Sequence, residues 1–231
     1  MSLLETAIGL LSPPQCVGCG SEGSSLCNDC SIAKILPFGP RCWRCNALGE
    51  NTRTCRSCRH VVGPSSVCIT TTYHDLSRDL VRKYKFGHQR AAAIVISKMM
   101  SETFLRYGES INLKNSNYLI VPVPTATSRV RRRGFDHSVL LAKHLGRQLG
   151  LDWAQALGRL GQGSQVGTGR TERLKQSSGH YFVRSPRQVN GQKVLLIDDV
   201  ITTGGTLLSA SQALRRAGAV RVDALVFAKR L

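Results

Sequence analysis

The chain has 231 residues, of which 42% are hydrophobic, and a formal net charge of +18. This length allows one ordinary domain with a buried core and a smaller module beside it. No apolar run approaches the roughly 18 residues that a membrane-spanning helix needs, so we expect a soluble protein without membrane insertion. Six basic and four acidic side chains lie in residues 1–64, so the rest of the chain carries +16. That excess favours polyanionic partners over a neutral surface, although a well-solvated basic surface is the alternative.

The N-terminal stretch 1–14 is partly apolar but contains Glu5 and no lysine or arginine. It therefore lacks the basic start of an export signal. We expect a cytoplasmic protein, in which cysteines stay reduced.

Eight of the nine cysteines form four Cys-x-x-Cys pairs, a spacing that indicates metal ligands rather than disulfides in a reducing compartment. In chain order they make two four-thiolate sets, which predict two structural zinc ions: Cys16, Cys19, Cys27 and Cys30, then Cys42, Cys45, Cys55 and Cys58. Interleaved pairing and, more weakly, an iron–sulfur cluster are alternatives. We assign residues 1–64 to a double zinc-ribbon domain and residues 65–231 to a second domain.

The second domain alternates short apolar runs with segments of helical periodicity. Strands are predicted at 67–73, 118–124, 194–197 and 220–228, and helices at 76–86, 90–107, 137–149 and 206–217. Because the runs are almost continuously apolar, they predict a parallel sheet covered by helices on both faces. Residues 125–136 and the longer stretch 158–180 are predicted to be loops.

The segment 194–206 is the strongest candidate site. Asp198 and Asp199 end a buried strand, and a loop of small residues then opens a helix. Parallel sheets bind ligands at this edge, and helix N-termini bind phosphate. The predicted phosphate contacts are Thr202, Thr203, Gly204, Gly205 and Thr206. Two carboxylates beside a phosphate suit neighbouring ribose hydroxyls, so the ligand is predicted to be a ribose 5-phosphate. The alternative is a simple turn with solvated aspartates.

A basic cluster follows the predicted strand 118–124. Its members are Arg129, Arg131, Arg132 and Arg133. Guanidinium groups present paired donors to phosphate oxygens, so the cluster suits a pyrophosphate. A solvated cluster, or one that faces nucleic acid, is the alternative.

Together these segments resemble the type I phosphoribosyltransferases. The cysteine pairs, Pro122-Val-Pro124 and Arg133-Gly-Phe-Asp-His137 resemble the ComF/GntX family of competence-associated proteins over nearly the whole chain. The resemblance implies the type I phosphoribosyltransferase fold and 5-phosphoribosyl-1-pyrophosphate (PRPP), bound with Mg²⁺, as the ligand. It also implies catalytic roles for Asp198 and Asp199, and Lys85 as a weaker pyrophosphate contact.

Two functional hypotheses follow. The first is a PRPP-binding protein of DNA uptake and natural competence, with single-stranded DNA and the uptake machinery as partners. The second is a Mg²⁺-dependent phosphoribosyltransferase with an unidentified acceptor. Aromatic residues make up only 6% of the chain, which weakens a stacking surface for single strands. The oligomeric state is left open, with a homodimer as one option.

Overall fold

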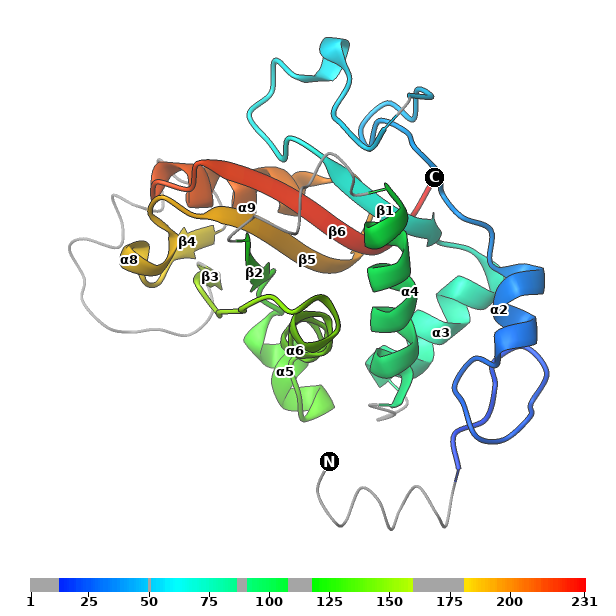
Figure 1. Cartoon of the computed structure of the whole chain (residues 1–231). Coiled ribbons are helices and arrows are strands. Elements are labelled where there is room, and N and C mark those ends of the chain that lie inside the picture. Colours follow the sequence, from blue (N-terminus) through cyan, green and yellow to red (C-terminus); the bar gives the residue numbers. More distant parts are fainter. Residues whose placement is uncertain (1–12, 50, 87–90, 108–117, 160–180) are drawn as a thin grey trace.

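A four-stranded parallel sheet forms the centre of the molecule in a computed structural model, which describes residues 13–49, 51–86, 91–107, 118–159 and 181–231 (Figure 1). The strand order is β1-β6-β5-β2. The strands are β1 (Val67–Thr72), β2 (Tyr118–Pro122), β5 (Lys193–Ile201) and β6 (Arg221–Lys229). All three pairings are parallel, so the carboxyl ends of the strands share one edge.

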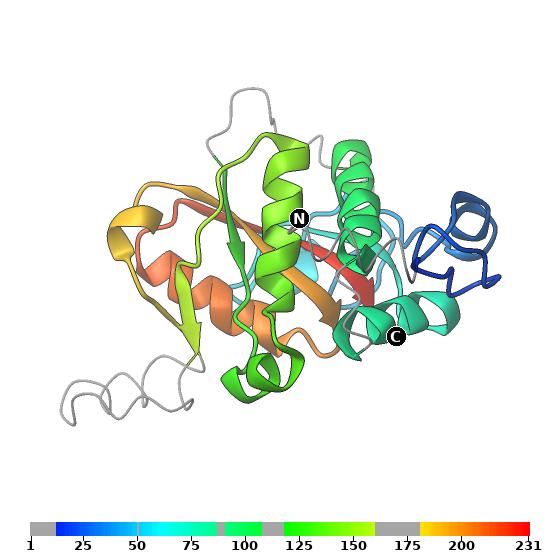
Figure 2. The same ribbon diagram turned by 90° about the horizontal axis from the view of Figure 1, so that it is seen from below.

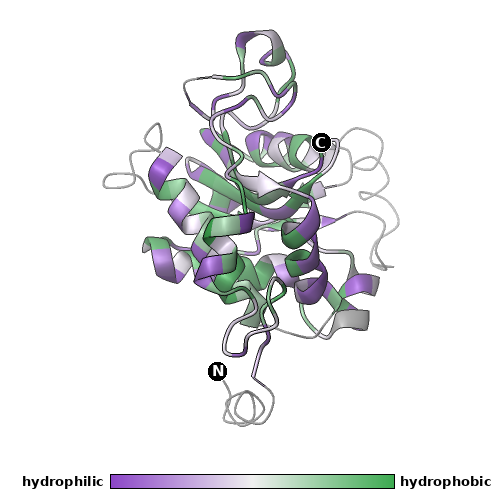
Figure 3. Ribbon diagram, turned by 90° about the vertical axis from the view of Figure 1, so that its right-hand side faces the viewer, coloured by the Kyte–Doolittle hydropathy of each residue, from purple (hydrophilic) through white to green (hydrophobic). Residues whose placement is uncertain are grey.

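Helices cover both faces of this sheet (Figure 2). On one face lie α3 (Asp75–Phe86), α4 (Ala91–Tyr107) and α6 (His137–Leu149), and on the other lies α9 (Gly205–Arg216). Strand β5 is apolar on both faces, so both need to be covered. Leu195 and Ile197 enter the core under α3, α4 and α6, and Val194 and Leu196 enter the core under α9. Hydrophobic residues accordingly line the inner sides of the helices (Figure 3). The predicted fold class, a parallel sheet between helices, is confirmed.

One predicted loop is wrong, because residues 125–136 contain the short helix α5 (Thr127–Arg133). Its arginine-rich sequence has no apolar periodicity to reveal it, although arginine is a good helix former. The helix ends at Gly134, whose φ of 76° is left-handed. Asp136 then caps α6 by accepting the Ser138 N–H at 3.0 Å, and this cap together with Gly150 fixes α6 at its predicted bounds.

The loop predicted at 158–180 begins later than expected, because residues 158 and 159 belong to a strand. Strand β3 (Leu157–Arg159) pairs antiparallel with β4 (Tyr181–Val183), and the short helix α8 (Pro186–Val189) follows. Residues 160–180 lie outside the described part of the chain.

The N-terminal cysteine units pack directly on the second domain. They contain α2 (Asn28–Lys34) and the 3₁₀ helix η1 (Arg56–Cys58). The Phe38 N–H donates to the Thr70 carbonyl at 3.0 Å, and the backbone of Arg53 forms an isolated antiparallel β-bridge with that of Ser66. Their apolar side chains enter both cores of the second domain. The division at residue 64 stays a prediction. None of the described helices is long and apolar enough to span a membrane.

Candidate functional site

The predicted phosphate-binding loop lies at the carboxyl edge of the sheet. Strand β5 ends at Ile201, residues 202–204 form a turn, and α9 begins at Gly205. Thr202, Thr203 and Thr206 are exposed residues, so a ligand can reach this loop from solvent. The first N–H groups of a helix have no carbonyl partner within it, and they carry the positive end of the helix dipole. The loop therefore offers N–H and hydroxyl donors to an anion.

Gly204 is the residue on which the shape of this loop depends. Its φ is +80°, a left-handed conformation that side chains disfavour, and it caps α9. A Cβ at this position would lie 2.3 Å from Cζ3 of Trp43. Gly205 differs, because a Cβ there would meet only Thr203 Oγ1, at 3.8 Å. The fold itself thus requires glycine at 204 and tolerates a side chain at 205.

Trp43 was missed by the sequence reasoning, although it supports the loop. It lies between Cys42 and Cys45 and is 2% exposed. Its indole Nε1–H donates to Thr54 Oγ1 at 3.0 Å, and its carbonyl accepts a hydrogen bond from Lys229 Nζ at 2.5 Å. A large aromatic side chain between paired cysteines, in a segment with little core of its own, is the signal that could have indicated docking of this segment on the second domain.

The two aspartates lie on opposite faces of β5. Successive side chains of a strand point to opposite faces of the sheet, and the neighbours of the two aspartates show the same arrangement. Asp199 forms an ion pair of 2.6 Å with Lys85, near the end of α3. Asp198 is close enough to Tyr181, on the α9 side, to influence it electrostatically. Lys85 thus joins the predicted site, held by a carboxylate in this structure.

Asp198 titrates near neutral pH. Burial, and then the charge of Asp199, raise the pKa of Asp198 to about 7, against the Asp199 N–H and the Lys85 charge, which lower it. At pH 7 this carboxyl group is consequently shared between its neutral and ionised forms. Such a group can accept or donate a proton, which makes it a candidate acid or base.

We expect Asp198→Asn to stabilise the folded protein at pH 8. The native carboxyl keeps its proton above pH 3.8, where the unfolded chain has lost it, so this group destabilises the folded state increasingly up to about pH 7. The gain should be on the order of 2 kcal/mol, because partial exposure to water screens the charge. Urea unfolding at pH 8 and pH 5.5 measures it. The gain should shrink at the lower pH, and equal stability of the two proteins at pH 8 would contradict the expectation.

The arginine cluster lies on α5, directly after β2 and therefore at the same edge of the sheet. Arg129 and Arg131 are exposed. For Arg132 and Arg133 the structure describes only the backbone, so their predicted contacts lie outside the described side chains. The edge thus brings together carboxylates from β5, a lysine from α3 and arginines from α5.

Tyr181 is a second residue that the sequence reasoning missed. It is 4% exposed and makes a side-chain hydrogen bond with Thr206, the second residue of α9. Burial raises the pKa of Tyr181, while the charges of Arg159 and Arg129 oppose the rise. Because Tyr181 begins β4, directly after a long polar stretch, no local pattern marked it. Its hydroxyl helps to fix the first turn of α9.

The eight paired cysteines form two clusters, as the sequential pairing predicts. Within each, all four sulfur atoms lie within 4.8 Å of one another. The Sγ atoms of Cys16 and Cys27 are 3.6 Å apart, and those of Cys45 and Cys55 are 3.7 Å apart. A tetrahedral zinc ion with Zn–S bonds of about 2.3 Å separates its sulfurs by about 3.8 Å. Each cluster could therefore hold one zinc ion without rearrangement.

The electrostatics of the first cluster also fit a cation. Burial alone raises the pKa of Cys16, but N–H groups of Cys27 and Gly18 outweigh it and lower that pKa to about 6. Burial and neighbouring sulfurs instead raise the pKa of Cys30. Four thiolates repel one another, so a bound cation is what would keep all of them ionised. Cys68, in contrast, is fully buried in β1, as expected for a strand residue.

The two clusters lie at different places on the second domain (Figure 1). The first approaches α3 and α4: a Cβ on Gly18 would lie 3.3 Å from Leu76, and Ser31 contacts Met99. The second lies beside the predicted phosphate-binding loop, through Trp43 and Gly204. Among the described residues, contact with the candidate loop therefore comes from the second cluster.

Comparison with known proteins supports this reading of the chain. Residues 132–231, which include the whole loop from β5 to α9, match the phosphoribosyl transferase domain. The chain is 27% identical to the competence protein ComFC of Streptococcus pneumoniae, over 86% of this chain and 85% of that protein. It is 28% identical to the DNA utilization protein YhgH of Salmonella typhimurium, over 86% and 82%. It is 26% identical to ComFC of Bacillus subtilis, over 92% and 83%.

Solved structures give more distant likenesses. An allosteric regulatory enzyme of purine biosynthesis aligns with a TM-score of 0.43 and 16% identity, over 64% of this chain and 30% of that one. APRTase from Giardia lamblia aligns with a TM-score of 0.37 and 20% identity, over 65% and 70%. The domain match and the relatives confirm the resemblance drawn from the sequence: residues 132–231 match the phosphoribosyl transferase domain, two four-cysteine clusters precede them, and most of the chain is similar to the ComFC and YhgH proteins.

Proposed function

We propose that this protein binds PRPP or ribose 5-phosphate, together with Mg²⁺, and acts in DNA uptake or utilization with single-stranded DNA as a partner. The observation that supports it best is the loop from β5 to α9, where N–H and hydroxyl groups that can donate hydrogen bonds to a phosphate lie next to the carboxyl group of Asp198. The names of the relatives, competence protein and DNA utilization protein, support the biological role. A cytoplasmic location, where thiols stay reduced, belongs to the same proposal.

The ligand would lie across the carboxyl edge of the sheet. Its 5-phosphate would accept N–H and hydroxyl donors from residues 202–206, and its ribose hydroxyls would donate to Asp198. Arg129 and Arg131, exposed on α5, would contact the pyrophosphate. Mg²⁺ bound to the pyrophosphate would offset part of its negative charge.

Catalysis of phosphoribosyl transfer is the second candidate function. One observation favours it: the Asp198 carboxyl group lies beside the phosphate loop, and burial together with the charge of Asp199 raises its pKa to about 7. In such a transfer the bond between C1 and pyrophosphate breaks while the ribose ring gains positive charge. An ionised Asp198 would stabilise that charge, and the arginines of α5 would stabilise the leaving group.

Titration calorimetry with PRPP and Mg²⁺ tests the proposed ligand. Asp198→Asn should weaken binding by roughly tenfold, because an amide keeps one acceptor oxygen and loses the charge. Asp199→Asn should weaken it less, since Lys85 already neutralises Asp199. Thr203→Val should also weaken binding, by removing a donor to the phosphate. Wild-type affinity should rise from pH 6 to pH 8, as Asp198 ionises, and the Asp198→Asn variant should lose that dependence.

The matched control is Asp152→Asn, an exposed carboxylate just before β3. It changes the net charge equally and should leave PRPP affinity unchanged. Absence of binding to the wild type at millimolar PRPP would overturn the ligand proposal. Release of pyrophosphate without an added acceptor, or with added nucleobases, separates the transferase from a protein that only binds.

A further inference from the structure

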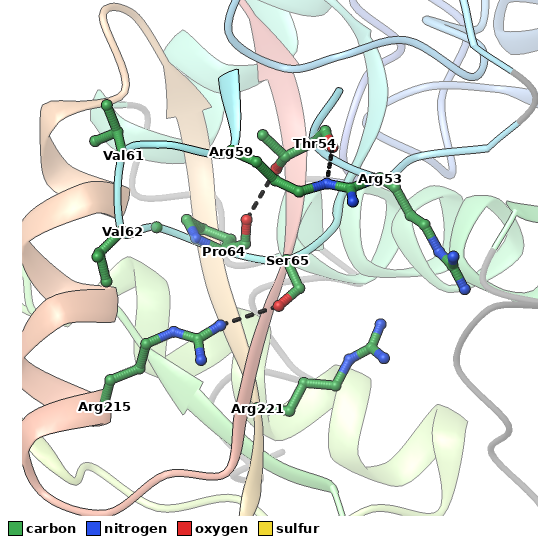
Figure 4. A pocket seen from close by; sticks show the side chains of 10 residues that line it. Arg53, Thr54, Arg59, Val61, Val62, Pro64, Ser65, Arg215 and Arg221 are labelled. Carbon is green, nitrogen blue, oxygen red and sulfur yellow. Dashed lines mark hydrogen bonds between the residues drawn. The ribbon is translucent and has the colours of Figure 1, made fainter. Parts of the chain in front are cut away.

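A second basic site lies where the second cysteine unit meets the C-terminal end of α9. It is a pocket of about 500 Å³ formed by residues from four segments. Arg53 and Arg59 come from the cysteine unit, Arg215 from α9 and Arg221 from the start of β6 (Figure 4). Ser65, just before β1, lies among them and donates its N–H to the Val222 carbonyl at 2.8 Å. The pocket thus lies at the amino edge of the sheet.

The pocket carries a large uncompensated positive charge. Its lining contains four arginines and no aspartate or glutamate. Only Arg221 pairs with a carboxylate among the described residues, through Asp223 at 2.6 Å, and Asp223 also accepts the Tyr118 hydroxyl. Three guanidinium groups consequently lack a counter-ion in the described part of the chain, and guanidinium forks match phosphate oxygens.

The protein holds two of these guanidinium groups in place. Arg215 donates to Ser65 Oγ at 3.0 Å, and Arg59 donates through Nε to the Thr54 carbonyl at 3.1 Å. The Nε atom of Arg215 is buried without a hydrogen-bond partner in the described residues. Fixing an arginine before binding reduces the entropy that a ligand must overcome.

This pocket is separate from the site at the carboxyl edge. Helix α9 runs from Gly205, at the phosphate-binding loop, to Arg216, one residue beyond the arginine of the pocket. At about 1.5 Å per residue, the ten steps from Gly205 to Arg215 span about 15 Å. One PRPP molecule cannot occupy both ends, so an anion bound by these arginines would be a different one.

We propose that the pocket binds phosphate groups of a single-stranded polynucleotide. This inference rests on the proposed DNA role and locates its binding surface. Two features favour a polymer over a free nucleotide. Arg53 and Arg59 line the pocket and are exposed, so they can reach phosphates that lie outside it. Val62, 56% exposed and part of the lining, offers an apolar surface to a base or sugar.

Fluorescence anisotropy with a labelled oligothymidylate tests the inference. The double variant Arg53→Gln/Arg59→Gln should bind at least about tenfold more weakly at 50 mM salt, because two phosphate contacts are lost. The slope of log K against log salt should flatten by about 1.4, since each contact contributes about 0.7 on single strands. PRPP affinity should stay unchanged. Arg221 is left intact, because removing it would leave Asp223 buried and unpaired.

The control variant is Arg147→Gln/Arg187→Gln, which removes two exposed arginines from α6 and α8 and gives the same net charge. If both double variants weakened oligonucleotide binding equally, the assignment of the binding site to this pocket would be overturned, because net charge alone would then explain the effect. Competition by dTMP or inorganic pyrophosphate as tight as the oligonucleotide would overturn the polymer assignment. If the wild type binds no oligonucleotide at all, the proposed DNA role fails as well, whereas PRPP binding is tested independently.

Discussion

Gly204→Ala is expected to destabilise the protein and to remove phosphate binding at the carboxyl edge of the sheet. The new methyl group would have to occupy space 2.3 Å from the Trp43 ring, in a backbone conformation with φ of +80°. Strain and overpacking together should lower the unfolding free energy by about 3 kcal/mol. For a chain of this size, that corresponds to a loss of roughly 6–12 °C in Tm. Thermal unfolding and PRPP calorimetry on the same samples measure both effects.

Gly205→Ala is the matched control. This position has no positive φ and no close neighbour, so alanine should leave Tm within about 2 °C of the wild type. PRPP affinity should nevertheless fall if the ligand approaches the backbone there, as the proposed phosphate position requires. Comparing the two variants should therefore separate an effect on the stability of the fold from an effect on the approach of the ligand to the backbone. Equal Tm values for them would contradict the role given to Trp43.

Loss of metal from the second cysteine cluster is expected to disable the phosphate-binding loop, and loss from the first is not. Elemental analysis should find two zinc ions per chain in the wild type. It should find one per chain in each of the variants Cys45→Ser and Cys19→Ser. These cysteines are equivalent, since each is the exposed second member of the first pair in its cluster. Only Cys45→Ser should weaken PRPP binding, by tenfold or more, because only its cluster holds Trp43 against Gly204.

Tryptophan fluorescence adds a readout that does not depend on PRPP. The chain has two tryptophans, and Trp153 packs beside Gly146 of α6, against a different core from the one that contains Trp43. In Cys45→Ser the emission of Trp43 should shift to the red as the ring becomes exposed to water. Introducing Trp153→Phe assigns the shift to Trp43. Equal losses of PRPP affinity in the two cysteine variants would show that zinc stabilises the whole chain rather than this loop.

The sequence predicted the elements whose own residues specify them. Helix α6 has a capping aspartate, an apolar face and a terminal glycine, and β5 has a run of apolar residues ended by Asp198. Each of these signals lies within the element. The candidate loop could be located for the same reason, because the position of a ligand site in a parallel sheet follows from the order of strand, turn and helix.

Contacts between distant segments could not be predicted in this way. Nothing near Gly204 indicates that a ring from the cysteine region lies against it, and nothing near Arg53 indicates Arg215. Helix α5 was missed for another reason, since an exposed helix of seven residues shows no apolar face. The roles of Gly204 and Gly205 were likewise separated only when the neighbours of each were known.

The hydrogen bond from Lys229 to the Trp43 carbonyl joins residues 186 positions apart. During synthesis at about 5–20 residues per second, Trp43 would leave the ribosome roughly 10–40 s before its partner. Over that interval the second cysteine unit has neither β6 nor α9 to pack against. Early metal capture would keep its thiols from oxidation and misassembly while the rest of the chain is made. Zinc supply during translation would then set the yield of folded protein.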